Sequence, residues 1–118
     1  MQPSEIRLIR ASLPRADLAD IAAQGFGDMV KAVVDVRRGI MAVGGELHSD
    51  EEAALLDDGS AQQDLWGINL YPADTTEEWI EFDSLINVRP SHGNASRSVE
   101  DEATRERIIE IVGSLVAD

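Results

Sequence analysis

Cysteine is absent from this 118-residue sequence, which excludes disulfide bonds, thiolate metal sites, iron–sulfur clusters and cysteine nucleophiles. Glycine and proline are few, with 9 and 4 residues, and apolar residues make up 43%, so a disordered or linker-like chain is excluded. No apolar run reaches the ~18 residues of a membrane helix, and residues 1–10 lack the features of a signal peptide. We expect one folded domain over residues 1–118, soluble and cytoplasmic.

Basic residues are also scarce: ten stand against 23 acidic ones, the formal net charge is −13, and Lys31 is the one lysine. Between Gly39 and Val88 there is no lysine or arginine, although twelve acidic residues fall there. A negative field repels phosphate backbones and anionic lipids, so we expect neither nucleic-acid nor membrane binding. The acidic segment is either solvated surface or a surface for a basic protein partner or for cations.

The first half of the chain reads as a strand, a helix and a hairpin. Alternating polar and apolar residues predict a strand over residues 5–10. Apolar residues at helical spacing predict a helix from a cap at Ser12 to an end at Gly25. β-Branched residues predict strands over 30–36 and 40–43, joined by a tight turn. Lys31 and Asp35 would share one face of the first of these strands and are expected to pair.

The second half reads as a short helix, two strands and a long helix. Ser49 or Asp50 is expected to cap a helix over residues 51–56. Strands are predicted over 65–71 and 79–83, the latter continuing toward Val88. Apolar residues at i, i+3, i+4 and i+7 predict an amphipathic final helix that begins near Ser98 or Asp101. Trp66 and Trp79 fall on the strands, where such a pair anchors a core or a dimer seam more often than it stacks a ligand.

The resulting order, β-α-β-β-α-β-β-α, predicts an α+β fold: an antiparallel sheet with helices packed on it. The order of the first six elements also matches the split βαβ pattern of ferredoxin-like folds, although an order of elements does not establish strand pairing. This scaffold carries no function by itself, because such folds host unrelated activities.

One candidate site is the run of Glu46, His48 and Asp50. On an extended backbone, residues spaced by two point to the same side, and carboxylate and imidazole ligands suit zinc, iron or manganese. The alternative is structural, with Asp50 capping a helix and the other two side chains lying in a solvated loop.

A second candidate is the loop from Arg89 to Arg97, in which Arg89, Ser91, Asn94 and Arg97 would bind an anion. Free N–H groups before a helix, with guanidinium groups nearby, favour an anionic ligand. Glu100 and the acidic residues that follow it would oppose such a ligand. In the alternative, the two arginines pair with the acidic middle segment, while Asn94 and Ser98 satisfy backbone groups.

The sequence lacks the motifs of the common cofactor sites and of serine hydrolases. There is no phosphate-binding loop, no dinucleotide fingerprint and no haem or iron–sulfur motif, and the cofactor stays unknown. No serine lies in a nucleophile elbow, and the two histidines offer few bases, so a serine hydrolase is not expected.

Four blocks of the sequence resemble the prokaryotic family known as domain of unknown function 5674. They are residues 24–35, 44–52, 63–72 and 80–90, accompanied by Gly93-Asn94 and by Val99-Glu100-Asp101. The resemblance implies a small soluble protein without an assigned activity, and it supplies no catalytic residues. It draws attention to polar residues within strand-like or loop motifs, namely Glu46, His48, Asp64, Asn69, Glu81, Asp83, Asn87, Arg89, Asn94 and Arg97. Asn69, Asn87 and Asp83 lie on predicted strands although β-propensity disfavours them there, so a site or a buried hydrogen-bond network is expected at these residues.

The leading hypothesis is a non-enzymatic binding module for a protein or a small polar ligand, forming a homodimer through an exposed sheet edge or the final helix. One alternative is a metal-assisted hydrolase that uses Glu46, His48 and either Asp50 or Asp83, with an anionic substrate group held by the arginines at 89 and 97. The other is a non-catalytic anion pocket from Arg89 to Arg97. Whether the protein is an enzyme stays open at this point.

Overall fold

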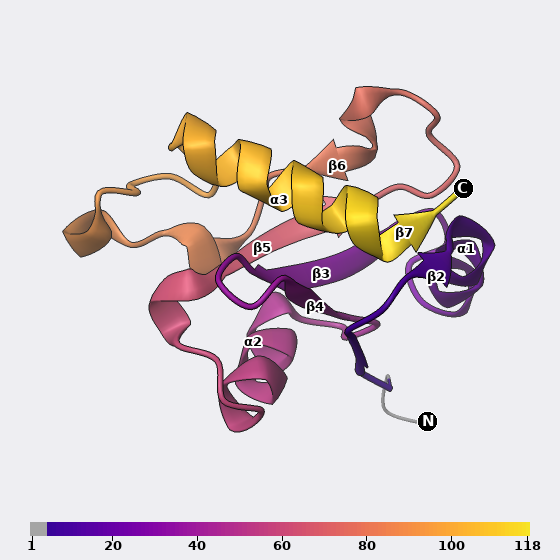
Figure 1. Ribbon diagram of the computed structural model, residues 1–118, viewed down its shortest axis with the longest axis horizontal. Helices are drawn as coiled ribbons and strands as arrows, with labels where there is room; N and C mark the ends of the chain where they lie inside the picture. Colours follow the sequence, from indigo (N-terminus) through magenta and orange to yellow (C-terminus); the bar gives the residue numbers. More distant parts are fainter. Residues whose placement is uncertain (1–4) are drawn as a thin grey trace.

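A five-stranded antiparallel sheet forms the centre of the protein (Figure 1). The computed structural model describes residues 5–118, and residues 1–4, part of the segment expected to lack a signal peptide, lie outside this range. The spatial order is β1 (Arg7–Ile9), β4 (Ile40–Val43), β3 (Val30–Asp35), β5 (Leu65–Leu70) and β6 (Ile80–Glu81). A short parallel pair joins β2 (Leu13–Pro14) to β7 (Val116–Ala117).

The helices of residues 5–118 are α1 (Arg15–Gln24), α2 (His48–Asp57) and α3 (Glu102–Leu115). Four 3-10 turns lie in the connections: η1 (Gln62–Asp64), η2 (Glu77–Trp79), η3 (Leu85–Asn87) and η4 (Pro90–His92). Within the described range, no helix combines the length and the apolar character needed to cross a lipid bilayer.

Helices cover both faces of the sheet. Leu18 of α1 and Ile108 of α3 belong to the main apolar cluster together with Val34 of β3. Leu55 of α2 packs instead with Val33 in a second, smaller cluster. Because neighbouring residues of a strand point to opposite faces, α2 lies on the face opposite to α1 and α3. Figure 1 shows α3 crossing in front of β3 and β5.

Two crossover units explain this arrangement. The units β1–α1–β3 and β4–α2–β5 each pass over one intervening strand and step across the sheet in the same direction, but their strands run in opposite directions. Right-handed crossovers of this kind place their helices on opposite faces. The predicted α+β class is confirmed. Both split βαβ units form, with the helices on two faces rather than together on one face as in a ferredoxin-like sandwich.

The predicted hairpin is confirmed, and Asp35 anchors its turn. The Asp35 carboxylate accepts the backbone N–H groups of Arg37 and Arg38, each at 2.9 Å, and the Ser60 hydroxyl at 2.6 Å. The buried Asp35 carboxylate is therefore already hydrogen-bonded to groups at its own end of β3. The expected pairing of Lys31 with Asp35 is not formed, because the two side chains lie at opposite ends of the strand.

The final helix was expected to begin near Ser98 or Asp101, and α3 begins directly after Asp101. Asp101 caps it, since its carboxylate accepts the Thr104 N–H at 2.9 Å. The caps expected at Ser12 and at Ser49 or Asp50 are wrong, because α1 and α2 begin without a side-chain cap. In α2 the helix starts at His48, so both expected caps fall inside its first turn.

The strand expected over residues 79–83 and toward Val88 is much shorter than predicted. Only Ile80–Glu81 pairs with β5. The chain then turns at Ser84, whose hydroxyl accepts the Ile86 N–H. Asn87 is held against Gly67 of β5: Gly67 donates its N–H to Asn87 Oδ1 at 2.8 Å, and Asn87 Nδ2 donates to the Gly67 carbonyl at 2.9 Å. The Asn87 side-chain amide thus makes with Gly67 the two hydrogen bonds that the backbone of a neighbouring strand would otherwise make.

Replacing Gly67 by alanine is expected to destabilise the fold. The added Cβ would lie 2.5 Å from the Ser84 Cβ, and overpacking of this kind typically costs about 1–3 kcal/mol of unfolding free energy. Gly113→Ala in α3 is the matched control, because its Cβ meets nothing within 4 Å and alanine favours a helix by up to about 1 kcal/mol. Urea unfolding followed by tryptophan fluorescence measures both variants. Equal stability of the two variants would contradict this packing.

Candidate functional site

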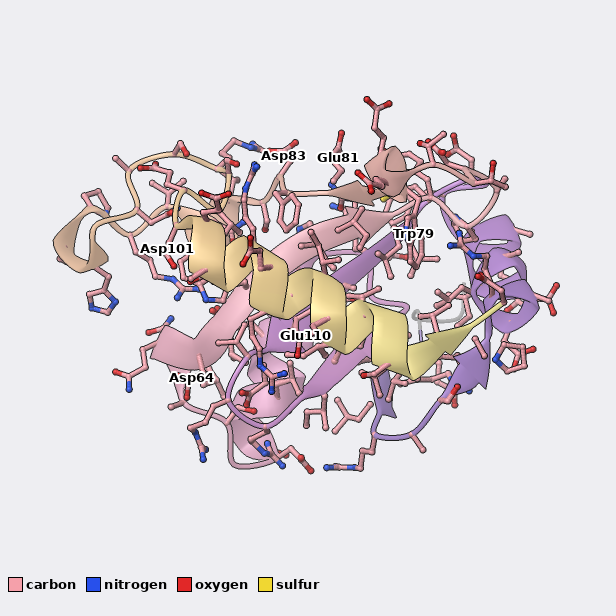
Figure 2. The ribbon with its side chains drawn as sticks, turned by 45° about the horizontal axis from the view of Figure 1, so that its top comes forward. Asp64, Trp79, Glu81, Asp83, Asp101 and Glu110 are labelled. Atoms are coloured by element: carbon pink, nitrogen blue, oxygen red, sulfur yellow. The ribbon has the colours of Figure 1, made fainter. Side chains whose placement is uncertain are left out.

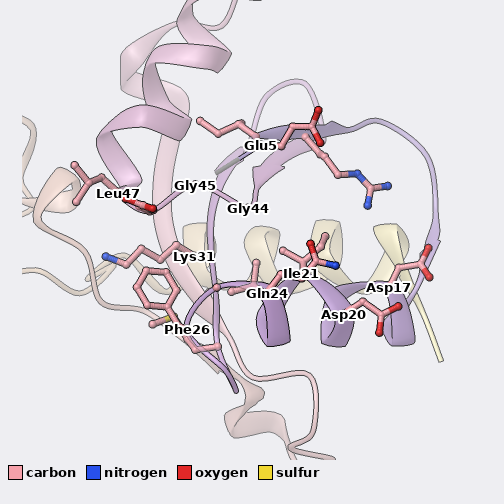
Figure 3. A pocket seen from close by; sticks show the side chains of 16 residues that line it. Glu5, Asp17, Asp20, Ile21, Gln24, Phe26, Lys31, Gly44, Gly45 and Leu47 are labelled. Carbon is pink, nitrogen blue, oxygen red and sulfur yellow. The ribbon is translucent and has the colours of Figure 1, made fainter. Parts of the chain in front are cut away.

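An open groove runs between α1 and the residues that follow β4 (Figure 3). We call it the α1 groove; its volume is about 1310 Å³. Residues 5–7 and 44–47 form one wall, and α1 with Phe26 forms the other. In Figure 3, Asp17 and Asp20 lie toward one end, and Lys31, Phe26 and Leu47 lie together at the other. The groove therefore has an acidic end and an end that combines one cation with apolar side chains.

The groove contains two basic side chains that form neither an ion pair nor a hydrogen bond with the rest of residues 5–118. Of the nine arginines, eight donate hydrogen bonds to carboxylates, hydroxyls or carbonyls elsewhere in the structure; they are Arg10, Arg15, Arg37, Arg38, Arg89, Arg97, Arg105 and Arg107. Arg7 and Lys31 line the groove, and within residues 5–118 neither forms an ion pair. In a chain with net charge −13, two unpaired cations in one groove are a feature that folding does not require.

Lys31 lies over an aromatic ring at the rim of the groove. Its Nζ is 5.2 Å from the centroid of Phe26, close enough for a cation–π interaction. Phe26 is 48% exposed and Leu47 is 54% exposed, so neither side chain is needed to fill the core. The cation and the two apolar groups form one accessible surface.

Glu51 lies directly behind the groove wall. Its side chain is completely buried, and Glu51 Oε2 accepts the Gly45 N–H at 3.0 Å. A Cβ at position 45 would come within 2.9 Å of Glu51 Cγ, so only glycine allows this close approach. Burial raises the pKa of the Glu51 carboxyl to about 9, although Lys31 and the Gly45 hydrogen bond oppose the shift. The carboxyl is therefore neutral at pH 7, with its proton on Oε1, since Oε2 is an acceptor.

His48 and Asn69 continue this buried polar region on the other side of Lys31. His48 Nε2 lies 2.8 Å from the Ile68 carbonyl oxygen, which requires that Nε2 carry a proton. Burial lowers the pKa of His48, so the ring is neutral at pH 7. Asn69 Nδ2 donates to Glu81 Oε1 at 2.8 Å and to the Asp83 carbonyl at 3.2 Å. Figure 2 shows Glu81 and Asp83 on one side of α3 and Asp64 on the other, so the acidic segment is divided between separate surfaces.

The candidate metal residues are not brought together. The hypothesis assumed an extended backbone, but His48 and Asp50 both lie in the first turn of α2, where residues two apart point about 200° apart around the axis. Glu46 lies in the exposed loop before the helix. No group of three His, Cys, Asp or Glu side chains within residues 5–118 could hold a metal ion.

The candidate anion residues are engaged by the protein itself. Arg97 pairs with Asp83 at 2.6 Å, as the structural alternative predicted. Arg89 donates instead to the carbonyls of Ile86 and Leu65 and lies over the Trp66 ring. Ser91 is exposed in η4, away from any of these contacts.

Asn94 and Glu100 complete the hydrogen bonding of this loop. Asn94 Nδ2 donates to the carbonyls of Asn87 and Ser98, and Asn94 Oδ1 accepts the Glu100 N–H. Glu100 Oε2 accepts the N–H groups of Ala95 and Ser96, at 3.0 and 2.8 Å. Hydrogen bonds from Ser96 and Ala95 lower the pKa of Glu100. The protein's own carboxylate therefore occupies the N–H groups that an external anion would need.

Residue-by-residue reasoning did not find the α1 groove. Its parts come from α1, β1, β3 and the loop after β4, which are separate in the sequence. Two signals were present: the single lysine, and the Gly44-Gly45 pair before an acidic helix. Neither points to a groove until the sheet order places α1 beside residues 44–47.

The fold and the groove together define a small acidic α+β protein with helices on both faces of an antiparallel sheet and an open groove at the end of its central strand. A family model described as "Protein of unknown function (DUF5674)" matches residues 7–115, and the chain belongs to this family. No curated protein and no solved structure matches the chain.

Asn94 is expected to matter for stability rather than for anion binding. Asn94→Ala leaves three carbonyls, those of Asn87, Ser96 and Ser98, and the Glu100 N–H without the Asn94 side chain as partner, and an unsatisfied buried group costs about 1–3 kcal/mol. Ser91→Ala, at an exposed position of the same loop, is the control and should leave the melting temperature unchanged. Thermal unfolding with and without inorganic phosphate tests this interpretation. Stabilisation by phosphate that requires Arg89 would contradict it.

Glu51→Gln is expected to change how stability depends on pH. In the folded protein the pKa of Glu51 is about 9, against an ordinary value of 4.5. The folded state therefore binds more protons between these values, and the free energy of unfolding falls as the pH rises through them. The slope is at most about 1.4 kcal/mol per pH unit, and the glutamine variant removes it.

The stabilities of Glu51→Gln and of the natural protein should be compared between pH 6.5 and 9. His48 has a lowered pKa, so its contribution has the opposite sign and is confined to pH values below its ordinary 6.5. The stability of Glu51→Gln relative to the natural protein should increase steadily across the chosen window in urea unfolding. Glu77→Gln, at an exposed position, should show no such trend. A constant difference for Glu51→Gln would show that the Glu51 carboxyl is ionised.

Proposed function

We propose that this protein is a non-catalytic binding module that takes a small polar ligand into the α1 groove. The observation that carries the proposal is the position of Lys31 and Arg7, which line the groove and lack ion pairs within residues 5–118. The other basic side chains are used to hold the fold together. A charged group kept free beside a groove is typical of a recognition site.

The lining indicates the chemistry of the ligand. Lys31 suits one anionic group, and the exposed surfaces of Phe26 and Leu47 suit an apolar group beside it. Four carboxylates also line the groove, at Glu5, Asp17, Asp20 and Glu46, and they disfavour a ligand with several negative charges. We therefore propose a ligand with a single carboxylate or phosphate next to an apolar part.

The other two functional hypotheses have less support. A metal-assisted hydrolase needs a ligand set that Glu46, His48 and Asp50 do not form. An anion pocket from Arg89 to Arg97 needs donors that carbonyls, Asp83 and Glu100 already occupy. The α1 groove is the place where unoccupied charge, exposed apolar surface and a concave shape coincide.

Sodium benzoate is a suitable probe because it combines one carboxylate with an apolar ring. Titration into ¹⁵N-labelled protein should shift the amide signals of Lys31, Gly44 and Gly45, whereas benzamide, which has no charge, should shift them much less. Lys31→Met is expected to weaken benzoate binding by roughly tenfold, as for the loss of one hydrogen bond to a charged group.

Arg37→Met is the matched control. Arg37 is an exposed cation just after the other end of β3, and it pairs with Asp64; its replacement changes the net charge by the same amount. Benzoate should bind this variant as it binds the natural protein. Equal weakening in both variants would indicate a general charge effect, and shifts confined to residues 89–97 would move the site to that loop.

A further inference from the structure

One polar layer lies between α2 and the sheet, at the end of β3 beside the α1 groove. Lys31 shares a strand face with Val33, which packs with Leu55 of α2, because alternate residues of a strand point to the same side. Glu51 precedes Leu55 by one helical turn and enters the same layer. Asn69 enters it from β5, directly opposite Lys31 in the antiparallel pair.

Two buried oxygen atoms in this layer lack a hydrogen-bond partner among the described residues: Glu51 Oε1 and Asn69 Oδ1. Glu51 is 0% exposed and Asn69 is 6% exposed, so neither is open to bulk water. Buried side-chain polar atoms are nearly always hydrogen-bonded, and each exception requires an explanation. Lys31 carries three N–H donors and acts electrostatically on Glu51.

Lys31 lies at the rim of the groove instead, over Phe26 (Figure 3). Side chains directly opposite in an antiparallel pair have Cβ atoms about 5 Å apart, and the lysine stem rotates about four carbons. Rotation of the stem therefore turns the ammonium away from Phe26 and toward Asn69 Oδ1. Because Lys31 also interacts electrostatically with Glu51, the same movement would supply a donor to Asn69 Oδ1 and, once Glu51 has lost its proton, one to Glu51 Oε1.

Building on the proposed function, we propose that Lys31 alternates between two positions and that a bound anion selects one of them. In the outer position the ammonium lies over Phe26 and holds the anionic group of the ligand. In the inner position it donates to Glu51 Oε1 and Asn69 Oδ1, and the end of the groove beside Phe26 and Leu47 has lost its cation. The ligand anion and the Glu51 carboxylate compete for the same ammonium.

This competition links binding to a proton. Glu51 keeps its proton on Oε1 while Lys31 is outside, and it releases that proton to solvent when Lys31 moves inside. An anion that draws Lys31 outward returns one proton from solvent to Oε1, and no other bond forms or breaks. The affinity for the anion therefore falls with rising pH, by up to about tenfold per pH unit once Glu51 titrates.

The charged groups that face this layer come from several elements. Asp50 on α2 acts on Glu51, and Lys31 and Asp83 act on His48. The His48 ring also lies within hydrogen-bonding reach of the Asn69 side chain. The pKa of His48 is lowered by burial, so its ring stays neutral above pH 6.5. Glu81 holds the amide of Asn69 in place, which directs Asn69 Oδ1 away from the sheet edge. Glu51 is the group whose charge the movement of Lys31 changes.

The single lysine makes a direct test possible, because protein grown with ¹³C-lysine gives signals from Lys31 alone. In the outer position the Phe26 ring shifts the Lys31 Hε signals upfield. We expect this upfield shift at pH 6.5, its loss as the pH rises toward 9.5, and its recovery at pH 8.5 when sodium benzoate is added. The dissociation constant of benzoate should rise with pH over the same range.

Three variants isolate the two positions. In Glu51→Gln the Lys31 signals and the benzoate affinity should not change with pH, whereas Glu52→Gln, the next residue of α2, should behave as the natural protein does. Phe26→Leu, at an exposed position, should abolish the upfield shift and so verify the readout. It also keeps the test valid if Glu51→Gln folds poorly.

The outcomes separate the two proposals. Lys31 signals that stay constant with pH in the natural protein overturn the alternation, whether or not benzoate binds. If benzoate binds Glu51→Gln with the same pH dependence as it binds the natural protein, the alternation of Lys31 is also overturned, but the proposed binding site in the α1 groove still stands. Movement of Lys31 with pH but no response to benzoate supports the alternation and counts against the proposed ligand chemistry.

Discussion

Burial of β3 on both faces is the constraint on which the rest of the structure depends. Residues 32–35 are all fully buried, and β3 is paired on both edges, with β4 and β5. A strand in this position needs apolar cover on two sides, and the two crossover connections provide it by placing α2 opposite α1 and α3. Polar side chains on β3 are therefore confined to its ends, where Lys31 and Asp35 lie.

The two ends of β3 differ in how their polar groups are satisfied. At one end, the Asp35 carboxylate accepts two backbone N–H groups and a hydroxyl, which closes the hairpin turn. At the other end, near Lys31, one oxygen of the buried Glu51 carboxyl and the Asn69 side-chain oxygen lack hydrogen-bond partners among the described residues. The hydrogen bonds of Asp35 are explained by their structural role in the turn. Where polar groups stay unsatisfied in an otherwise consistent fold, a role in function is the physical explanation to test first.

The loop from Arg89 to Arg97 shows how a pattern typical of a site can be a scaffold. Its donors were recognisable from the sequence, and so was the opposing Glu100. Asn87, which β-propensity disfavours in a strand, is indeed part of a buried hydrogen-bond network, and Asn94 of the loop belongs to the same network. The sequence could not show that this network closes on itself, because its acceptors are carbonyls of β5 and of the loop itself, and every residue supplies the same carbonyl group.

The sequence by itself determined the α+β class, the hairpin around Gly39, and the amphipathic face of α3 with its start near Asp101, because each of these depends on the spacing or the chemistry of residues near one another in the chain. It also determined the strong negative charge. Only the tertiary structure decided the strand order, the two covered faces, the division of the acidic residues between surfaces, and the position of Lys31 opposite Asn69 and within electrostatic reach of Glu51. These depend on which strands pair and on which side each crossover helix lies, and contacts between distant segments have no local pattern in the sequence.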